Sequence, residues 1–94
     1  MSEVKLLEFW APWCKPCKAL EPVLDKLAER IPVERVNADE DPDTAARYDV
    51  LSLPTVVLVA DGRPVATIVG ARPLHVFESW LDEVLPAAEL RTDA

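Results

Sequence analysis

Apolar and polar residues follow one another along the first half of this chain in a pattern that predicts strand, helix and strand. Val4–Trp10 is almost continuously apolar, which is typical of a strand covered on both faces. In Lys15–Arg30 the apolar residues recur at helical spacing, so this segment predicts a helix that contains Pro22. Pro32 ends that helix, and Val33–Asn37 alternates as a second short strand.

The middle of the chain predicts a short helix and a third strand. Thr44–Tyr48 follows the acidic loop Asp39–Asp43, which we interpret as a solvated turn and not as a metal site. Asp41 or Asp43 would cap the short helix, because a carboxylate accepts well from the free amide groups of a first turn. Thr55–Ala60 is the most apolar strand in the chain.

A hairpin and a long helix complete the pattern. Asp61–Gly62 is a strong hairpin signal, so Val65–Val69 should be a fourth strand, antiparallel to the third. Pro73 suits the first turn of a final helix, and we expect the tail after Pro86 to be frayed. One face of that helix would carry Leu74, Phe77, Trp80, Leu81, Val84 and Leu85.

The predicted order is therefore β-α-β-α-β-β-α. Two crossover connections predict parallel strands joined by right-handed units. The expected fold class is α/β, with a four-stranded mixed sheet and helices on both faces. The 94 residues form one domain, 1–94, with an ordered core of about 4–86.

Composition and charge exclude several classes of protein. Half of the residues are apolar, which excludes intrinsic disorder. Ten basic residues against 17 acidic ones give a net charge of −7, which disfavours nucleic acid and anionic membrane as partners. No apolar run is long enough for a membrane span, and the N-terminus lacks the features of a signal peptide. We therefore expect a cytoplasmic protein.

The two cysteines, Cys14 and Cys17, form a single Cys-x-x-Cys motif. A disulfide across so short a loop contributes little to the stability of a fold. A structural zinc site needs four ligands, usually Cys and His, and besides the two cysteines the chain has only His75. A zinc ion bridging two copies of the chain stays open, but redox activity explains the pair better. The motif opens the first helix, whose N-terminus would stabilise an exposed Cys14 thiolate, while Cys17 would be more buried. Pro16 fits the first turn, where its missing N–H costs nothing.

At these residues the chain resembles the thioredoxin family. Two departures are Lys15–Pro16, where the family has Gly-Pro, and the absence of the N-terminal strand and helix. The resemblance implies a minimal thioredoxin fold and covers about residues 4–85. It rests on Phe9-Trp10-Ala11-Pro12-Trp13-Cys14-Lys15-Pro16-Cys17-Lys18, Leu53-Pro54-Thr55, Asp61-Gly62 and Val69-Gly70-Ala71.

The resemblance also implies site residues around the cysteines. Pro54 would be a cis proline beside the cysteines, holding the backbone of Leu53 where an extended client segment can pair with it. Lys15, Pro16 and Trp13 would tune the active site. The apolar rim that binds the client would consist of Trp13, Leu53, Pro54, Val69, Gly70 and Ala71.

Glu8 is a further candidate, because it interrupts an apolar strand. A carboxyl group between two helical layers must be neutral or partnered. Thioredoxins often have a buried Asp at this position, so Glu8 is a possible proton relay to Cys17. Arg35 would lie near this carboxyl or be a solvated charge at the strand edge. We interpret Trp10 as core and His75 as an ordinary surface residue.

The leading hypothesis is a thiol–disulfide oxidoreductase that reduces client proteins through Cys14 and Cys17. It would be a monomer without a bound cofactor, using only its Cys14–Cys17 disulfide, with a flavin-dependent thioredoxin reductase as electron donor. One alternative is a glutaredoxin-like, glutathione-dependent oxidoreductase, although glutaredoxins have Pro-Tyr between the cysteines. Another is a non-catalytic binding module, against which the retention of both cysteines argues.

Overall fold

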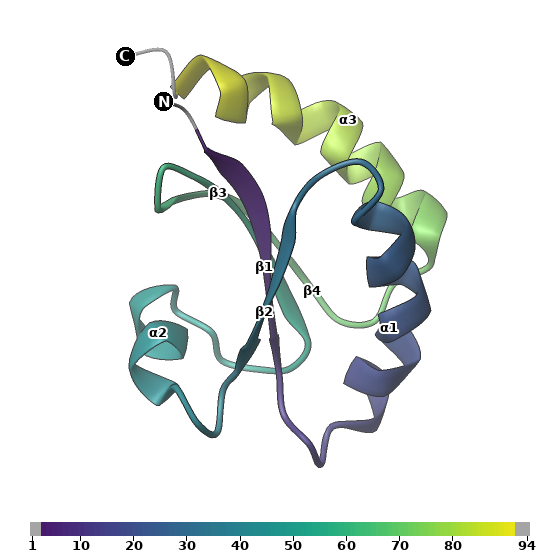
Figure 1. The fold of residues 1–94 in the computed structure, drawn as a ribbon, viewed down its shortest axis with the longest axis vertical. Coiled ribbons are helices and arrows are strands. Elements are labelled where there is room, and N and C mark those ends of the chain that lie inside the picture. Colours follow the sequence, from purple (N-terminus) through teal and green to yellow (C-terminus); the bar gives the residue numbers. More distant parts are fainter. Residues whose placement is uncertain (1–2, 92–94) are drawn as a thin grey trace.

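The computed structural model describes residues 3–91, which form a single sheet with three helices (Figure 1). Their order, β-α-β-α-β-β-α, confirms the predicted order. The elements are β1 (Val4–Trp10), α1 (Lys15–Leu27), β2 (Val33–Asn37), α2 (Pro42–Arg47), β3 (Thr55–Ala60), β4 (Arg63–Val69) and α3 (Leu74–Arg91).

The sheet has the strand order β2-β1-β3-β4. Strands β1 and β2 are parallel, whereas β3 is antiparallel to both β1 and β4. The expectation of two parallel crossovers was therefore wrong for the second connection. Helix α2 has six residues and spans only about 9 Å, too little to return along the sheet, so β3 starts at the end where β2 stops.

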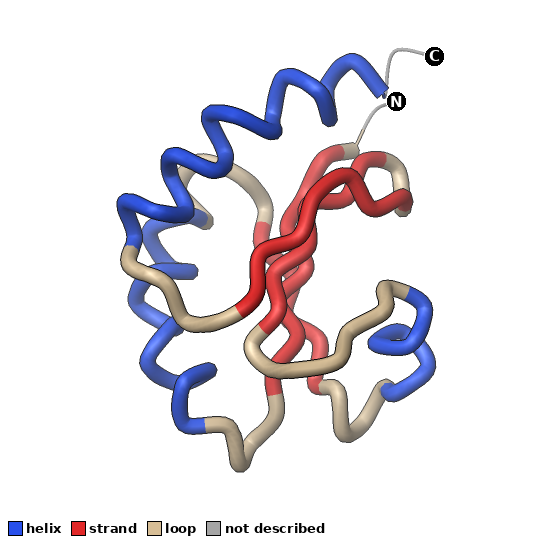
Figure 2. The backbone as a smooth tube through the Cα atoms, turned by 180° about the vertical axis from the view of Figure 1, so that it is seen from behind, coloured by secondary structure: helices blue, strands red, loops and turns tan. Residues whose placement is uncertain are grey.

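The helices cover both faces of the sheet, as predicted. Helices α1 and α3 lie together on one face, and α2 lies alone on the other (Figure 2). Because side chains alternate along a strand, Leu6 of β1 packs in the core under α1 and α3, while Leu7 and Phe9 pack on the α2 side. Strand β3 is buried along its whole length between the two layers.

The β3–β4 hairpin closes with the turn predicted from Asp61 and Gly62. Both residues have positive φ angles, 51° and 82°, as a two-residue turn of the primed type requires. Strand β4 begins at Arg63, two residues earlier than expected. Pro64 is tolerated there because β4 is an edge strand.

All three helices differ from the prediction at their C-terminal ends, although α2 differs by one residue only, since it ends at Arg47 and not at Tyr48. Helix α1 ends at Leu27, and the next residues form turns up to the buried Ile31. Helix α3 continues through Pro86 to Arg91, so the expected frayed tail was wrong as far as Arg91. Ala88, two residues after Pro86, is fully buried in the core, and its burial holds the last turns in place.

Helix α2 is capped as expected. Of the two candidate caps it is Asp41 that acts, accepting hydrogen bonds from the backbone N–H and the hydroxyl of Thr44. Among residues 3–91, no helix is long and apolar enough to cross a membrane.

Candidate active site

A disulfide joins Cys14 and Cys17 at the start of α1, with their Cα atoms 5.3 Å apart. Cys14 is the N-cap of α1, and the backbone N–H of Cys17 donates to Cys14 Sγ over 3.2 Å. Pro16 lies in the first turn, as predicted. The first turn contains no acidic residue, so nothing there opposes negative charge on Cys14 Sγ.

Both cysteines are buried in this oxidised structure. Cys14 is 3% exposed and Cys17 is 1% exposed, so the expectation of an exposed Cys14 was wrong. The pair packs with Ala11, and the partly buried Trp10 and Leu53 contact the same cluster. The position of Cys14 at the N-terminus of a helix predicts that its sulfur is accessible to solvent. This position does not reveal that side chains from other segments cover the sulfur.

The peptide bond between Leu53 and Pro54 is cis, as the resemblance implied. Pro54 is buried, and its carbonyl oxygen accepts a hydrogen bond of 2.9 Å from the N–H of Gly70. Gly70 has a φ of +98°, a conformation that favours glycine. This bond fixes the segment that contains Val69 and Gly70 beside the cis proline, so two of the predicted rim segments lie together.

Exposed apolar side chains surround this part of the surface. Trp13 is 68% exposed, Leu51 is 96% exposed and Val69 is 46% exposed. Single exposed apolar residues are common, but several beside one reactive group indicate a binding surface.

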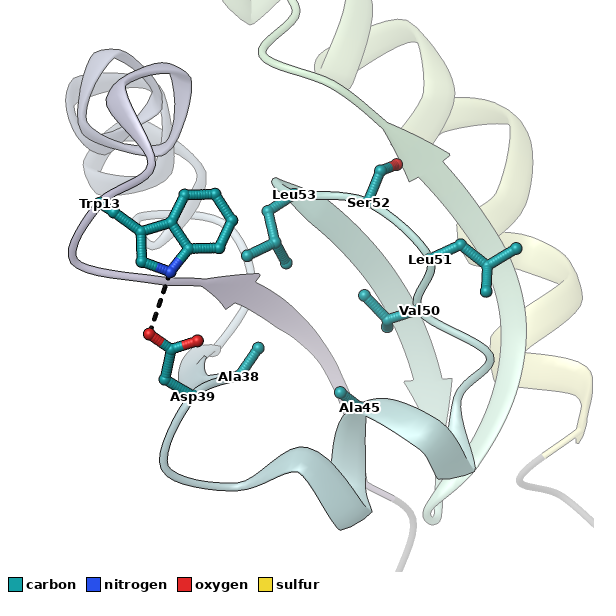
Figure 3. A pocket seen from close by; sticks show the side chains of 8 residues that line it. All are labelled: Trp13, Ala38, Asp39, Ala45, Val50, Leu51, Ser52 and Leu53. Atoms are coloured by element: carbon teal, nitrogen blue, oxygen red, sulfur yellow. Dashed lines mark hydrogen bonds between the residues drawn. The ribbon is translucent and has the colours of Figure 1, made fainter.

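A cavity of about 240 Å³ lies between the loop that carries Trp13 and the segment before Pro54. The indole N–H of Trp13 donates to Asp39 Oδ2 over 3.0 Å, which fixes the ring at its edge (Figure 3). Leu53 contributes to both the cavity and the disulfide cluster, so the two are continuous. The full lining is Trp13, Ala38, Asp39, Ala45, Val50, Leu51, Ser52 and Leu53.

Of these lining residues, only Trp13 and Leu53 were predicted from the sequence as binding residues. Asp39, interpreted as part of a solvated turn, and Leu51 were not predicted. The available signal was weak: Leu51 is an apolar residue in a loop and is almost fully exposed, whereas its neighbour Val50 packs against the core on the α2 side. The other predicted rim residues, Pro54, Val69, Gly70 and Ala71, do not line this cavity.

Glu8 is fully buried, as predicted, on the face of the sheet that α1 covers. Its Oε1 accepts a hydrogen bond of 3.1 Å from Arg35 Nε, while its Oε2 has no hydrogen-bond partner among the described residues. Burial raises the pKa of Glu8, the hydrogen bond and charge of Arg35 oppose that rise, and the negative charge of Glu21 adds to it. Of the two alternatives left open for Arg35, a position near this carboxyl and a solvated charge at the strand edge, the structure shows the first.

Trp10 is partly buried, so its interpretation as plain core was incomplete. The guanidinium carbon of Arg35 lies 4.8 Å from the centre of the Trp10 ring, within the range of a cation–π contact. The indole therefore covers the arginine that holds Glu8.

Two further candidates, His75 and Lys15, have exposed side chains. His75 is exposed in the first turn of α3, as expected. Lys15 is exposed at the start of α1. Within residues 3–91, no group of three His, Cys, Asp or Glu side chains is placed to hold a metal ion.

These features define the class of protein. An α/β domain that presents a Cys-x-x-Cys disulfide at a strand-to-helix junction, beside a cis proline, is a thiol–disulfide oxidoreductase. The profile of the Thioredoxin family matches residues 1–83, and the chain belongs to the thioredoxin family.

The relatives agree with this assignment. A thioredoxin of Staphylococcus epidermidis is 43% identical over 88 residues, covering 89% of this chain and 85% of the relative. A thioredoxin of Staphylococcus aureus is 42% identical with the same coverage. Among solved structures, a mutant thioredoxin from Halobacterium salinarum NRC-1 matches with a TM-score of 0.80 and 37% identity, covering 87% of this chain and 74% of that one. The protein is a redox carrier of the protein-disulfide reductase type, and its redox-active group is the Cys14–Cys17 disulfide.

Proposed function

We propose that Cys14 is the nucleophile and Cys17 the resolving cysteine in the reduction of client proteins. The observation that carries this assignment is the position of Cys14 as the N-cap of α1, where the N–H of Cys17 points at its sulfur. A helix N-terminus favours an anion, so Cys14 is the sulfur that holds a thiolate more readily. Trp13, Lys15, Pro16 and Pro54 would tune it as its neighbours.

The reaction proceeds in two exchanges. The Cys14 thiolate attacks one sulfur of the client disulfide, that S–S bond breaks, and the other client sulfur leaves as a thiolate. Cys17 then loses its proton and attacks Cys14 Sγ, which breaks the mixed disulfide and releases the second client sulfur. Two electrons pass to the client, and the protein ends with its Cys14–Cys17 disulfide.

The client would bind as an extended segment beside Pro54. The backbone of Leu53 can pair with such a segment by strand addition. Val69, Gly70 and Ala71 follow on one side, and Trp13 with the cavity in front of Leu51 lies on the other. The exposure of Trp13 and Leu51 supports a client with an apolar side chain close to its cysteine.

Glu8 would be the base that takes the proton of Cys17 in the second exchange. It lies on the sheet face covered by α1, the helix that contains Cys17. Its Oε2, which has no hydrogen-bond partner within residues 3–91, can accept a proton, and the raised pKa of Glu8 brings proton transfer to this carboxyl closer to neutral pH.

Electrons would return to the protein from a flavin-dependent thioredoxin reductase, which makes the protein part of an electron-transport chain. We propose a monomer that works in the cytoplasm, where reducing conditions suit a disulfide reductase. The net charge of −7 argues against nucleic acid and anionic membranes as partners.

Reduction of insulin disulfides, with dithiothreitol as electron source, tests the assignment. Cys14→Ser should abolish turnover, because a serine hydroxyl is a far poorer nucleophile than a thiolate. Cys17→Ser should also stop turnover but accumulate a mixed disulfide between Cys14 and the client, seen by mass spectrometry. If Cys14→Ser trapped the client and Cys17→Ser did not, the two roles would be reversed.

A further inference from the structure

Glu8, Arg35 and Glu21 form a chain of three charged side chains that leads from the interior to the surface. Glu8 is fully buried, the Arg35 side chain is 37% exposed and the Glu21 side chain is 50% exposed. Arg35 Nε lies 3.1 Å from Glu8 Oε1, and Arg35 Nη2 lies 3.7 Å from Glu21 Oε2. One cation therefore faces two carboxylates.

The surroundings of Arg35 leave it room on the side of Glu21. The Trp10 ring covers one side of the guanidinium at 4.8 Å. On another side lies a cavity of about 60 Å³ lined by Glu21, Leu24, Asp25 and Arg35. This volume is enough for at least one water molecule, so the guanidinium can shift towards Glu21 without a steric clash.

Sharing Arg35 weakens its effect on Glu8. A single positive charge neutralises one carboxylate. Any attraction that draws Arg35 towards Glu21 therefore reduces the electrostatic stabilisation that Arg35 gives to the Glu8 carboxylate. The negative charge of Glu21 acts in the same direction, because it raises the pKa of Glu8 directly. Because of both effects, Glu8 binds a proton more tightly than it would if Arg35 formed an ion pair with Glu8 alone.

The other elements around Glu8 add no competing charge. Strand β3 contains no titratable residue, and the buried face of α3 is apolar. Helix α1 places two charged residues, Glu21 and Asp25, beside Arg35. The charged residue that β2 places beside Glu8 is Arg35 itself. Among residues 3–91, Asp25 makes no ion pair with Arg35.

We propose that Glu21 is a positioning residue for the resolving step: through Arg35 it sets how readily Glu8 takes the proton that Cys17 releases. The inference rests on the proposed role of Glu8 as the base. It assigns to an exposed residue of α1, which contacts neither sulfur nor client in the proposed reaction, a part in the pH dependence of the reaction.

The first test follows the Glu8 carboxyl carbon by NMR as a function of pH in the oxidised protein. In Glu21→Gln the titration of Glu8 should move to lower pH, because Arg35 then serves Glu8 alone. In Arg35→Gln it should move to higher pH. Asp25→Asn is the matched control: it removes the same charge from the same cavity without an ion pair to Arg35, so its effect should be clearly smaller.

The second test follows the resolving step itself. A mixed disulfide between Cys14 and a client peptide releases the peptide at a rate that rises with pH as Glu8 becomes a carboxylate. In Glu21→Gln this rise should begin at lower pH, which increases the rate on the rising part about two- to fivefold. Glu8→Gln should remove the rise altogether.

The outcomes separate the two hypotheses. If Glu21→Gln leaves the Glu8 titration unchanged, or if Asp25→Asn shifts it equally, Glu21 does not act through Arg35 and the inference is wrong. If the titration shifts but the release rate does not, the charged chain exists while Glu8 is not the base, and it is the proposed role of Glu8 that fails. A shift in both measurements supports both.

Discussion

The two sides of the Cys14–Cys17 disulfide are built in opposite ways. On the outer side, Trp13 and Leu51 expose large apolar surfaces to water. On the inner side, Glu8 buries a carboxyl with one oxygen unpaired among the described residues. Each side reverses the usual distribution, in which apolar groups lie inside and charged groups outside.

This difference separates two tasks of the same reaction. The outer side loses its unfavourable contact with water when an apolar client segment covers it, so it governs which client binds. The inner side loses its unfavourable charge when Glu8 takes up a proton, so it governs when Cys17 can react. Changes on one side should therefore leave the other task almost unaffected.

The largest effect should come from the inner side. Glu8→Gln should raise the free energy of unfolding at neutral pH by about 1–3 kcal/mol, because it removes a buried, incompletely bonded charge. Urea unfolding measures this, and Glu34→Gln is the control, because Glu34 is an exposed carboxylate of the neighbouring strand, paired with Lys5. The resolving step should slow in the same Glu8 variant.

The increase in the free energy of unfolding expected for Glu8→Gln should also depend on pH. Because folding raises the pKa of Glu8 above its ordinary value of 4.5, the folded protein holds this proton more tightly than the unfolded chain. The contribution of Glu8 to stability is therefore fully present below that value and is lost as the pH rises through the folded pKa. The advantage of Glu8→Gln should grow over the same window, and an advantage independent of pH would show that Glu8 does not titrate there.

A smaller effect is expected on the outer side. Trp13→Ala should raise the KM for a protein client about tenfold, as for a central aromatic contact of an interface, and leave kcat nearly unchanged. Stability should change by less than about 0.5 kcal/mol, since the ring is mostly exposed. Trp13→Phe keeps an aromatic ring but loses the hydrogen bond to Asp39, so it should give an intermediate KM. Equal KM values in all three proteins would contradict a client surface at Trp13.

The smallest effect concerns Lys15, next to the nucleophile. A cation there favours the Cys14 thiolate, which exists only in the reduced protein, and so makes the couple more oxidising. Lys15→Gln should shift the reduction potential to more negative values by roughly 5–20 mV, less at high salt. A redox titration against glutathione measures the shift, and a more positive potential would show that Lys15 does not stabilise the thiolate.

Local pattern was enough to predict most of the fold. The apolar runs of β1 and β3, the hairpin turn and the cap of α2 depend on neighbouring residues, and all are confirmed. The burial of Glu8 followed from its place in an apolar strand. The direction of β3 and the last turns of α3 could not be predicted in this way, because both depend on how distant segments pack.

Only those parts of the site that depend on residues close together in the sequence were predicted. The cysteine pair and the cis proline were found through a motif and a resemblance. The hydrogen bond between Trp13 and Asp39 joins residues 26 positions apart, and the ion pair of Glu21 with Arg35 joins α1 to β2. Such contacts arise from folding, and no spacing in the sequence marks them.

The antiparallel course of β3 has a practical consequence for attaching probes to this protein. Since β3 starts directly after the cis proline and runs away from it, the turn at Asp61 and Gly62 lies about 20 Å along the strand from Pro54. A fluorophore or a tether on the exposed side chain of Arg63 would sit at this opposite pole of the molecule. The protein could thus be immobilised on a surface or fused to a reporter there, with its reactive end pointing freely into solution.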